Sequence, residues 1–392
     1  MGQTEAVYAF KTHEKYFYHL KMVQKPSLIA IDFDQNPFIV IWETTRSCAL
    51  KCSHCRAEAM DRRSPDELTS KEAFNLLKEI RLFGHPLVVL TGGDPLRRPD
   101  IVDIVKRGSE LGLSMALTPS GTPEVTLEKL NELKENGLAR LAVSLDGSSA
   151  QIHDHFRQVA GSFQWTLNII QWANQIGLPV QINTTITKHN LEDVDAIVDL
   201  LQTLNIVLWS VFFLVPVGRG KVEAEVSAID YEKVFHKMVD LSMRCSFDIK
   251  STEAPHFRRV VLQRRKAADG ARFRISATSL SGVNDGKGFV FISHTGEIFP
   301  SGFLPLSAGN VKINSLVEIY RHSMIFKTIR DYSQLKGKCG ICEYRSVCGG
   351  SRARAFAITG DMMASDPFCV YVPKNYSIIQ KENKFWADPI EL

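Results

Sequence analysis

From residue 38 to residue 214, strand-like and helix-like segments alternate along the chain. The strand-like segments are short apolar runs rich in β-branched and aromatic residues, at 38–42, 86–90, 113–117, 141–145, 179–186 and 206–214. The segments between them are amphipathic and long enough for helices, at 69–83, 99–112, 124–136, 163–177 and 190–204. Strands that are apolar on both faces are typical of a parallel sheet covered by helices. The pattern therefore predicts an α/β fold, with the sheet either curled into a barrel or open and doubly wound.

The first group of cysteines follows the first predicted strand directly. Cys48, Cys52 and Cys55 are spaced C-x₃-C-x₂-C. Three thiolates this close in sequence can converge on one metal centre, and in an iron–sulfur cluster they leave one iron open to another ligand. A zinc knuckle or a chance cluster of buried thiols is the alternative.

The second group of cysteines lies near the C-terminus, after a predicted β-hairpin at 289–293 and 297–300 and short predicted helices. It comprises Cys339, Cys342, Cys348 and Cys369, with spacings of x₂, x₅ and x₂₀. Four thiolates can close a cluster without an open iron, or they can hold a tetrahedral zinc ion. Both interpretations remain open from spacing alone.

The composition excludes some classes of partner. The 47 basic and 43 acidic residues leave a net charge of only +4, which does not indicate a nucleic-acid-binding protein. No stretch approaches the roughly 18–20 apolar residues of a membrane span, and the N-terminus lacks the features of a signal peptide. The grouped cysteines suit metal ligation better than a disulfide framework, so we expect a cytoplasmic protein in a reducing environment.

The ends of the predicted strands carry the residues expected to bind ligands, because ligands of α/β folds bind at the carboxyl ends of the strands. Gly92, Gly93 and Asp94 follow the second strand, and two adjacent glycines allow close approach to the backbone. Polar residues occupy or follow the later strands, namely Thr118, Ser120, Ser144, Asp146 and Asn183. For Ser144 and Asp146, capping of the following helix is the competing explanation.

The C-x₃-C-x₂-C spacing after the first strand resembles that of the radical S-adenosylmethionine (SAM) superfamily. The resemblance implies a partial (β/α)₆ TIM-like barrel with the cluster loop after its first strand. It also implies a [4Fe–4S] cluster on Cys48, Cys52 and Cys55 that binds SAM, and reductive cleavage of SAM to a 5′-deoxyadenosyl radical. That radical would abstract hydrogen from a substrate in the barrel.

The same resemblance implies contacts to SAM. Gly92, Gly93 and Asp94 resemble the family's Gly-Gly-Glu motif for the amino group, with Asp in place of Glu. Arg157 resembles the arginine that pairs with the SAM carboxylate, although Gln158 replaces the usual following glycine. The stretch 215–220 would approach the adenine. Further contacts to SAM are expected from Ser144, Asp146 and Asn183.

The C-terminal cysteines resemble those of SPASM or twitch extensions, which carry auxiliary [4Fe–4S] clusters. In two-cluster extensions the hairpin ends in Pro-Cys, whereas this chain has Pro300-Ser301. The resemblance therefore implies one auxiliary [4Fe–4S] cluster, held by Cys339, Cys342, Cys348 and Cys369, and two [4Fe–4S] clusters in all. It also divides the chain into an N-terminal arm at 1–36, the radical SAM core barrel at 37–225, a helical linker on the substrate side at 226–285, and a small iron–sulfur domain of hairpin and short helices at 286–392.

This pattern is similar to the branch that holds haem-pathway decarboxylases and haem d₁ synthesis proteins, alongside peptide maturases. We therefore expect an enzyme that acts on a tetrapyrrole, with its propionates meeting a basic helix that contains Arg258, Arg259, Arg264 and Arg265. Maturation of a ribosomally made peptide is the alternative, and a non-catalytic iron–sulfur sensor or zinc scaffold is a third. A flavodoxin or ferredoxin would supply electrons to the enzyme.

Overall fold

A computed structural model describes residues 31–267, 273–276, 281–374 and 376 of the chain. Its strands are β1 (Ile39–Glu43), β2 (Leu87–Thr91), β3 (Ser114–Leu117), β4 (Leu138–Ser144), β5 (Val180–Ile186), β6 (Leu208–Phe213), β7 (Asp248–Thr252), β8 (Phe289–Ile292), β9 (Glu297–Phe299) and β10 (Gly309–Asn310). The α-helices are α2 (Ser70–Arg81), α3 (Ile101–Glu110), α4 (Leu127–Glu135), α5 (Ala150–Arg157), α6 (Ser162–Gln175), α7 (Val194–Thr203), α8 (Ala228–Ser242), α9 (Phe257–Ala267), α11 (Leu316–His322), α12 (Met324–Arg330), α13 (Gly337–Ile341) and α14 (Arg352–Thr359).

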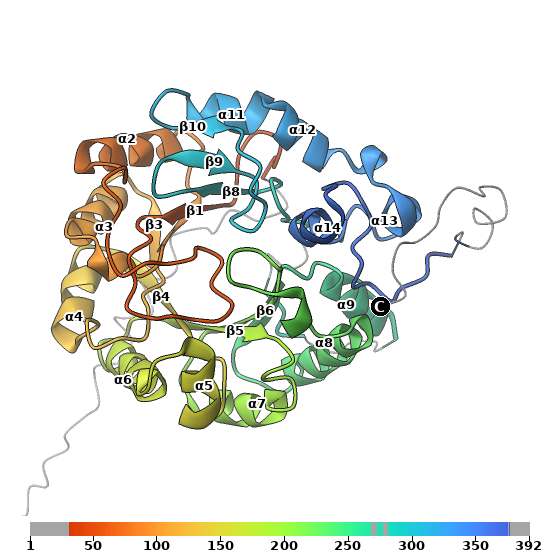
Figure 1. Cartoon of the computed structure of the whole chain (residues 1–392), viewed down its shortest axis with the longest axis horizontal. Helices are drawn as coiled ribbons and strands as arrows, with labels where there is room; N and C mark the ends of the chain where they lie inside the picture. The colour runs from red at the N-terminus through yellow and green to blue at the C-terminus, as the bar shows by residue number, and fades with distance from the viewer. Residues whose placement is uncertain (1–30, 268–272, 277–280, 375, 377–392) are drawn as a thin grey trace, which may run out of the picture.

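The strands form one curled sheet in the order β10-β9-β8-β1-β2-β3-β4-β5-β6-β7. All pairings from β8 through β7 are parallel, and only the two pairings within β8, β9 and β10 are antiparallel. Figure 1 looks into the curled sheet, with the helices in a ring around it. The sheet does not close on itself, so the predicted partial TIM-like barrel is confirmed.

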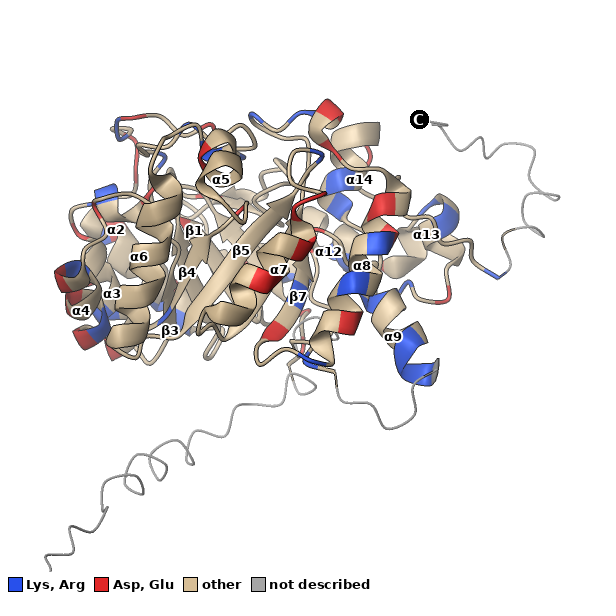
Figure 2. Cartoon of the chain, turned by 90° about the horizontal axis from the view of Figure 1, so that it is seen from below, with Lys and Arg blue, Asp and Glu red and all other residues tan. Residues whose placement is uncertain are grey.

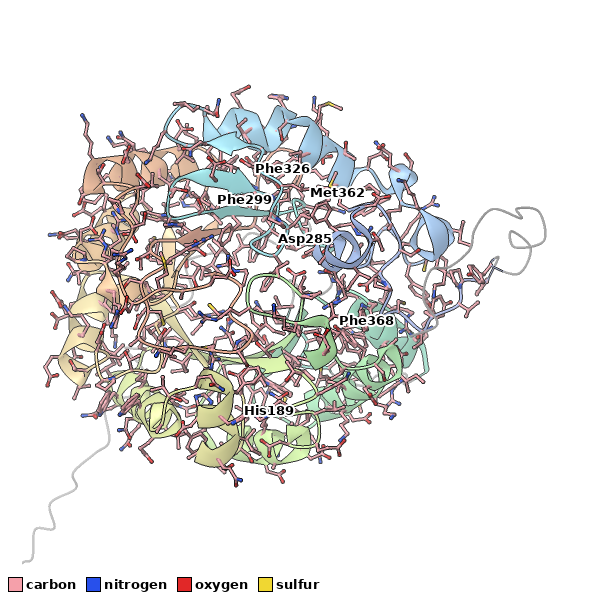
Figure 3. All side chains as sticks on the ribbon, viewed as in Figure 1. His189, Asp285, Phe299, Phe326, Met362 and Phe368 are labelled. Atoms are coloured by element: carbon pink, nitrogen blue, oxygen red, sulfur yellow. The ribbon has the colours of Figure 1, made fainter. Side chains whose placement is uncertain are left out.

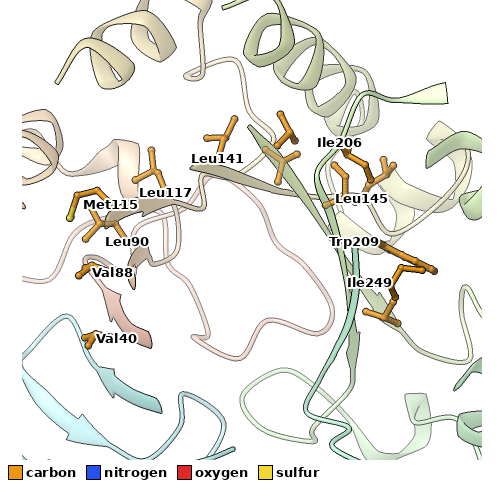
Figure 4. Close-up of a cluster of buried hydrophobic side chains, with 14 of the residues drawn as sticks. Val40, Val88, Leu90, Met115, Leu117, Leu141, Leu145, Ile206, Trp209 and Ile249 are labelled. Carbon is orange, nitrogen blue, oxygen red and sulfur yellow. The ribbon is translucent and has the colours of Figure 1, made fainter. Parts of the chain in front are cut away.

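Alternate residues of the strands face two different environments. Large apolar side chains on the outer face of the sheet pack under the helices and form the main core, which Figure 4 shows along the curve of the sheet from Val40 to Ile249. Residues of opposite parity, such as Ser144, Asn183 and Lys250, face inward and stay partly exposed. The inner face is therefore the polar, solvent-reached side of the barrel.

The chain extends the six-stranded pattern by a parallel strand at each side. β7 pairs with β6 in the segment that was expected to be only helical, and β8 of the C-terminal hairpin pairs with β1. The predicted hairpin is thus present, but its first strand belongs to the same sheet as the barrel. The carboxyl ends of β1 and β8 consequently lie side by side.

Most of the predicted N-terminal arm, residues 1–30, lies outside the described residues. The described remainder is held by the C-terminal helices: the Tyr320 hydroxyl donates to the Phe33 carbonyl at 2.7 Å, and Arg321 Nε donates to the Gln35 carbonyl at 3.0 Å. No helix in the described part of the chain combines the length and the apolar character that spanning a membrane requires.

Candidate active site and auxiliary cysteine site

The loop that carries the first three cysteines is fixed by backbone hydrogen bonds at the carboxyl end of β1. The Cys48 amide donates to the Met60 carbonyl at 2.6 Å and closes the loop on itself. The Gly93 and Asp94 amides donate to the carbonyls of Thr45 and Ser47 at 2.7 and 2.6 Å. The Gly-Gly-Asp segment after β2 therefore supports the cysteine loop directly.

Both glycines of this segment are required by close packing. A Cβ atom on Gly92 would lie 2.4 Å from the Thr45 carbonyl oxygen, and one on Gly93 would lie 2.4 Å from the Ser47 carbonyl oxygen. Such distances are far below van der Waals contact, so a side chain would displace the loop. Close approach of two backbone segments explains why the sequence has two adjacent glycines here.

The three thiols lie in one small cluster of buried side chains with Leu50. The Leu50 and Ala59 amides donate to the sulfurs of Cys48 and Cys55 at 3.3 and 3.5 Å, which suits thiolates that bind a metal. Ser120, at the end of β3, lies 3.2 Å from the Cys48 sulfur and also donates to the Gly93 carbonyl. Burial raises the pKa of the Cys48 thiol to about 11, so a bound cation is needed to keep it as thiolate at neutral pH.

Arg157, at the end of α5, connects the cysteine loop to β4 and β5. One guanidinium nitrogen donates to the Cys52 sulfur at 3.5 Å, and another pairs with the buried carboxylate of Asp146, which also accepts the Thr185 amide. Burial opposes the charge on Arg157, but the Asp146 carboxylate outweighs it and raises the pKa of the guanidinium. The third guanidinium nitrogen, Nε, is buried and has no partner among the described residues. The Arg157 Nε–H can therefore still donate a hydrogen bond to a negatively charged ligand.

The other expected SAM contacts are arranged differently from one another. Ser144 and Asn183 are neighbours in register on β4 and β5 and face the barrel interior. Asp94 is fully buried, and its carboxylate accepts the Leu96 amide at 3.1 Å as the cap of a 3₁₀ turn at Pro95–Arg97. Asp146 caps no helix, because the side chain that precedes α5 is Ser149. The structure thus brings Asp146, Arg157 and the cysteine loop together, while the Asp94 side chain serves the turn.

The stretch 215–220 after β6 covers the cysteine loop from the other side. The Arg219 amide donates to the Cys55 carbonyl at 3.0 Å, and its guanidinium reaches the carbonyls of Cys52 and Ala59. Gly218 has φ +59°, and a Cβ there would lie 2.4 Å from the Arg56 carbonyl oxygen. The glycine-rich end of this strand signalled close approach, but the role of Arg219 was missed.

A buried ionic network also escaped sequence reasoning. Glu43, the last residue of β1, pairs with Arg46, with Arg56 and with His294 of the hairpin, at 3.1, 2.9 and 3.0 Å. Burial acts to raise the pKa of Glu43, but these partners lower it to about 2. Arg56 also donates to the Gly302 carbonyl. The network joins the cysteine loop to the hairpin. Its only signal in the sequence is a charged residue, Glu43, at the end of a predicted strand.

The four C-terminal cysteines line one cavity, together with Lys338, Arg345, Asp366 and His256. Backbone amides donate to three of the sulfurs: Asp366 to Cys339, Tyr344 to Cys342 and Gly350 to Cys348, at 3.4–3.5 Å. Across the described ranges, no three His, Cys, Asp or Glu side chains are grouped to hold a single metal ion. This absence applies to both groups of cysteines, and the second group is defined by the cavity that its four thiols line.

Ser301 is buried at the end of the hairpin, where two-cluster extensions would have cysteine. Its hydroxyl donates to the Glu253 carboxylate at 3.2 Å, and Ser351 donates to the other oxygen of the same carboxylate at 2.9 Å. Burial, together with the nearby Asp285, raises the pKa of Glu253 above its usual range. Asp285, which Figure 3 labels beside α14, accepts the first two amides of that helix. The end of the hairpin is therefore occupied by hydrogen-bonded carboxyl and hydroxyl groups and supplies no thiol.

The basic helix α9 does not offer its arginines to the barrel mouth. Arg258 donates to the carbonyls of Val283 and Val347, and Arg259 pairs with Glu232. Arg264 pairs with Asp240. In Figure 2 the basic end of α9 points away from the end of the sheet where α5 lies. Arg265 lies over the ring of Phe273, at 5.5 Å from its centroid. The expectation that these arginines receive substrate propionates was therefore wrong, because their guanidinium groups are used within the fold.

Comparison with known proteins gives the family. Residues 42–201 match the model of the radical SAM superfamily. Over 341 residues the chain is 40% identical to an AdoMet-dependent heme synthase of Methanosarcina barkeri, covering 86% of this chain and 97% of that protein. It is 27% identical to a PqqA peptide cyclase of Bradyrhizobium diazoefficiens, covering 89% and 90%.

Among solved structures, the fold is similar to Streptococcus suis SuiB bound to precursor peptide SuiA, with a TM-score of 0.68 and 18% identity over 86% of this chain and 76% of that one. This likeness concerns the fold. The family match and the 40% identity to the heme synthase show which family the chain belongs to, and the fold agrees. The chain is an enzyme of the radical SAM superfamily, whose members use S-adenosylmethionine and a [4Fe–4S] cluster.

Proposed function

We propose that this enzyme modifies an iron-containing tetrapyrrole by oxidative decarboxylation of propionate side chains. The observation that carries the proposal is the 40% identity to an AdoMet-dependent heme synthase that the chain matches over 97% of its length. The peptide cyclase relative is markedly less similar, at 27% identity. A tetrapyrrole is therefore the favoured substrate, and a peptide is the alternative.

Cys48, Cys52 and Cys55 would hold the radical-generating cluster. Their thiols share one buried cluster of side chains and receive two backbone amides, which fits three thiolate ligands. When bound, the cluster and SAM together supply a 5′-deoxyadenosyl radical. The loop's own contribution is a rigid support, since Gly93, Asp94 and Arg219 fix its backbone from two sides.

SAM would lie between the cysteine loop and the carboxyl ends of β4 and β5. The unpartnered Nε of Arg157 supports a contact with the SAM carboxylate, because a buried N–H without an acceptor is costly. Asp146 would hold that guanidinium in place. Gly92, Gly93 and Asp94 would contact the amino group through their backbone, and Ser144 and Asn183 would face the nucleoside from the barrel interior.

Cys339, Cys342, Cys348 and Cys369 would hold one auxiliary [4Fe–4S] cluster. Each thiolate of such a cluster binds a different iron, so four thiolates complete it. Four cysteines that line one cavity support the cluster. The hydrogen-bonded Ser301 supports a count of one auxiliary cluster, because the hairpin then supplies no further thiolate.

The electron balance of the reaction requires both a donor and an acceptor. Removing a hydrogen atom from the propionate carbon next to the ring and releasing CO₂ forms a vinyl group and leaves one electron to be taken up. The auxiliary cluster would take up that electron. A flavodoxin or ferredoxin would reduce the first cluster. The eight cysteines form no disulfide, which suits a cytoplasmic, reducing location.

Anaerobic turnover with defined substrates tests this proposal. The reconstituted enzyme is incubated with SAM, a reductant and an iron tetrapyrrole that carries propionates, and the pigment is analysed by mass spectrometry. We expect the loss of CO₂ and two hydrogens from a propionate, together with formation of 5′-deoxyadenosine. An unchanged pigment, with SAM cleaved only when a peptide substrate is present, would favour the maturase alternative.

A further inference from the structure

His256 is a buried imidazole without a hydrogen-bond partner. Only 1% of its surface is exposed, and neither Nδ1 nor Nε2 bonds to another described residue. Buried polar groups in proteins are almost always satisfied, because an unsatisfied one loses the hydrogen bonds it made in water. The ring therefore requires a partner that the described part of the chain does not supply.

The ring of His256 lines the cavity of the four C-terminal cysteines. Its orientation is fixed by two aromatic neighbours: Tyr231 stacks on it at a centroid distance of 5.4 Å, and Phe235 meets it edge-on at 4.7 Å. Packing of this kind prevents the ring from turning to another partner. A group bound in the cavity of the four cysteines is therefore the partner that the His256 ring can reach.

The nearby Asp366 does not satisfy His256. The closest approach, from His256 Nδ1 to Asp366 Oδ2, is 3.7 Å, which is beyond hydrogen-bond range. The Asp366 carboxylate already accepts the amides of Ser351 and Phe368 and lies 3.5 Å from Arg354. An imidazole keeps at least one ring N–H whether it is neutral or protonated, so His256 retains a donor.

We propose that His256 donates its ring N–H to a sulfur of the auxiliary cluster and thereby raises the reduction potential of that cluster. This inference rests on the auxiliary cluster of the proposed function. The reduced cluster carries one more negative charge than the oxidised cluster, so a hydrogen bond stabilises the reduced form more. Four cysteines already supply one thiolate to each iron, which makes His256 a donor that tunes the cluster rather than a ligand.

Cations around the cavity act in the same direction. Lys338 and Arg345 line it, and a guanidinium nitrogen of Arg352 lies 3.8 Å from the Cys339 sulfur. Positive charge near a cluster favours the added electron. The buried Asp366 carboxylate, which also lines the cavity, acts in the opposite direction, so the His256 N–H and these three cations favour reduction against this one anion.

The reduction potential of the isolated auxiliary cluster tests this role. A chain with Cys48, Cys52 and Cys55 changed to Ala keeps only the C-terminal cluster, and its potential is measured by redox titration with electron paramagnetic resonance. His256→Phe keeps an aromatic ring but removes the N–H, whereas His256→Gln keeps an N–H donor. His236→Phe, at a half-exposed histidine on α8, is the matched control.

We expect His256→Phe to lower the equilibrium constant for reduction about tenfold, which is about 59 mV for one electron. His256→Gln and His236→Phe should stay within about threefold of the parent at unchanged iron content. An unchanged potential in His256→Phe overturns the inference while leaving the cluster itself in place. If His256→Phe loses iron, His256→Gln decides: a near-parent potential supports the hydrogen bond, and a tenfold loss overturns it. A parent protein that holds zinc or no iron contradicts the auxiliary cluster instead.

Discussion

At the scale of single residues, Arg157 connects the cysteine loop to the buried carboxylate of Asp146. Its guanidinium touches the Cys52 sulfur and the Asp146 carboxylate, and its Nε remains unpartnered. A lysine in this place could keep the charge, but it could not make three contacts in one plane. The geometry of the group is therefore as important as its charge.

Arg157→Lys should weaken SAM binding about tenfold or more, because lost charge-assisted hydrogen bonds cost about 1.5–3 kcal/mol. Equilibrium dialysis with labelled SAM on the reconstituted protein measures the change. Arg107→Lys, at an exposed pair with Glu110, is the control and should bind SAM normally. An affinity within twofold of wild type in Arg157→Lys would remove Arg157 from the SAM site.

Lys250 is a second residue whose environment works against its charge. It faces the barrel interior from β7, and its side chain makes no hydrogen bond or ion pair with another described residue. Burial and the nearby Arg140 lower its pKa from 10.5 to about 8. A cation kept at a cost to stability on the inner face is suited to an anionic ligand.

The contribution of Lys250 to the stability of the protein should consequently rise with pH between about 8 and 10.5, and it is isolated by comparing wild type with Lys250→Met. In that range the unfolded chain binds more protons at Lys250 than the folded one does, so raising the pH favours the folded state. Urea denaturation should show Lys250→Met to be about 1–3 kcal/mol more stable than wild type at pH 7 and to lack this rise. Lys233→Met on the exposed surface should change neither property. Parallel pH profiles for wild type and Lys250→Met would contradict the lowered pKa.

At the scale of elements, the site depends on backbone contacts between the loops that follow β1, β2 and β6. Those contacts need glycine at positions where backbones meet, and Gly93 is one example, with carbonyl oxygens of Ser47 and Arg46 at 2.4 and 2.7 Å from its ideal Cβ position. The cysteine loop is therefore positioned by its neighbours and not by its own sequence alone.

Gly93→Ala should displace the cysteine loop and reduce 5′-deoxyadenosine formation at least tenfold, while the C-terminal cysteine cavity stays intact. The measurement is SAM cleavage together with iron content, which should fall towards that of the C-terminal site alone. Gly84→Ala is the control for backbone strain outside the cysteine loop: Gly84 has φ +95°, but no atom lies within 4 Å of its ideal Cβ position, so SAM cleavage should stay normal. Normal cleavage in Gly93→Ala would show that the loop does not need this close contact.

The elements also show what the sequence can and cannot predict. The strands β1 to β6 were predictable because their apolar runs are buried under helices, and the cysteine spacings and glycine pair marked both candidate sites. β7 was missed because only Ile249 of its five residues is buried in the core, which gives no strand pattern. The pairing of β8 with β1 and the use of the α9 arginines within the fold depend on distant contacts that local patterns do not contain.

At the scale of the whole molecule, one sheet joins the barrel to the C-terminal hairpin. β8 continues the sheet beside β1, and the ionic network of Glu43 ties the first cysteine loop to the hairpin. The two cysteine sites are nevertheless built from separate ligands and separate loops. Loss of one metal centre should therefore leave the other able to form.

Replacing Cys342 and Cys348 by Ala should lower the iron content from about eight to about four per chain. SAM cleavage without substrate conversion should remain, because the first cysteine loop is not changed. Iron analysis and product analysis on the same preparation measure both effects. About twelve irons in the wild type, or zinc in the C-terminal site, would contradict the assignment of one auxiliary cluster.

The most direct test of the account follows hydrogen from substrate to SAM. An iron tetrapyrrole with deuterium on the propionate carbons next to the ring is turned over anaerobically, and the 5′-deoxyadenosine is analysed by mass spectrometry. The account predicts one deuterium in each 5′-deoxyadenosine that accompanies a decarboxylated propionate. The variant with Cys48, Cys52 and Cys55 changed to Ala should form no 5′-deoxyadenosine. Decarboxylated pigment with unlabelled 5′-deoxyadenosine would contradict it.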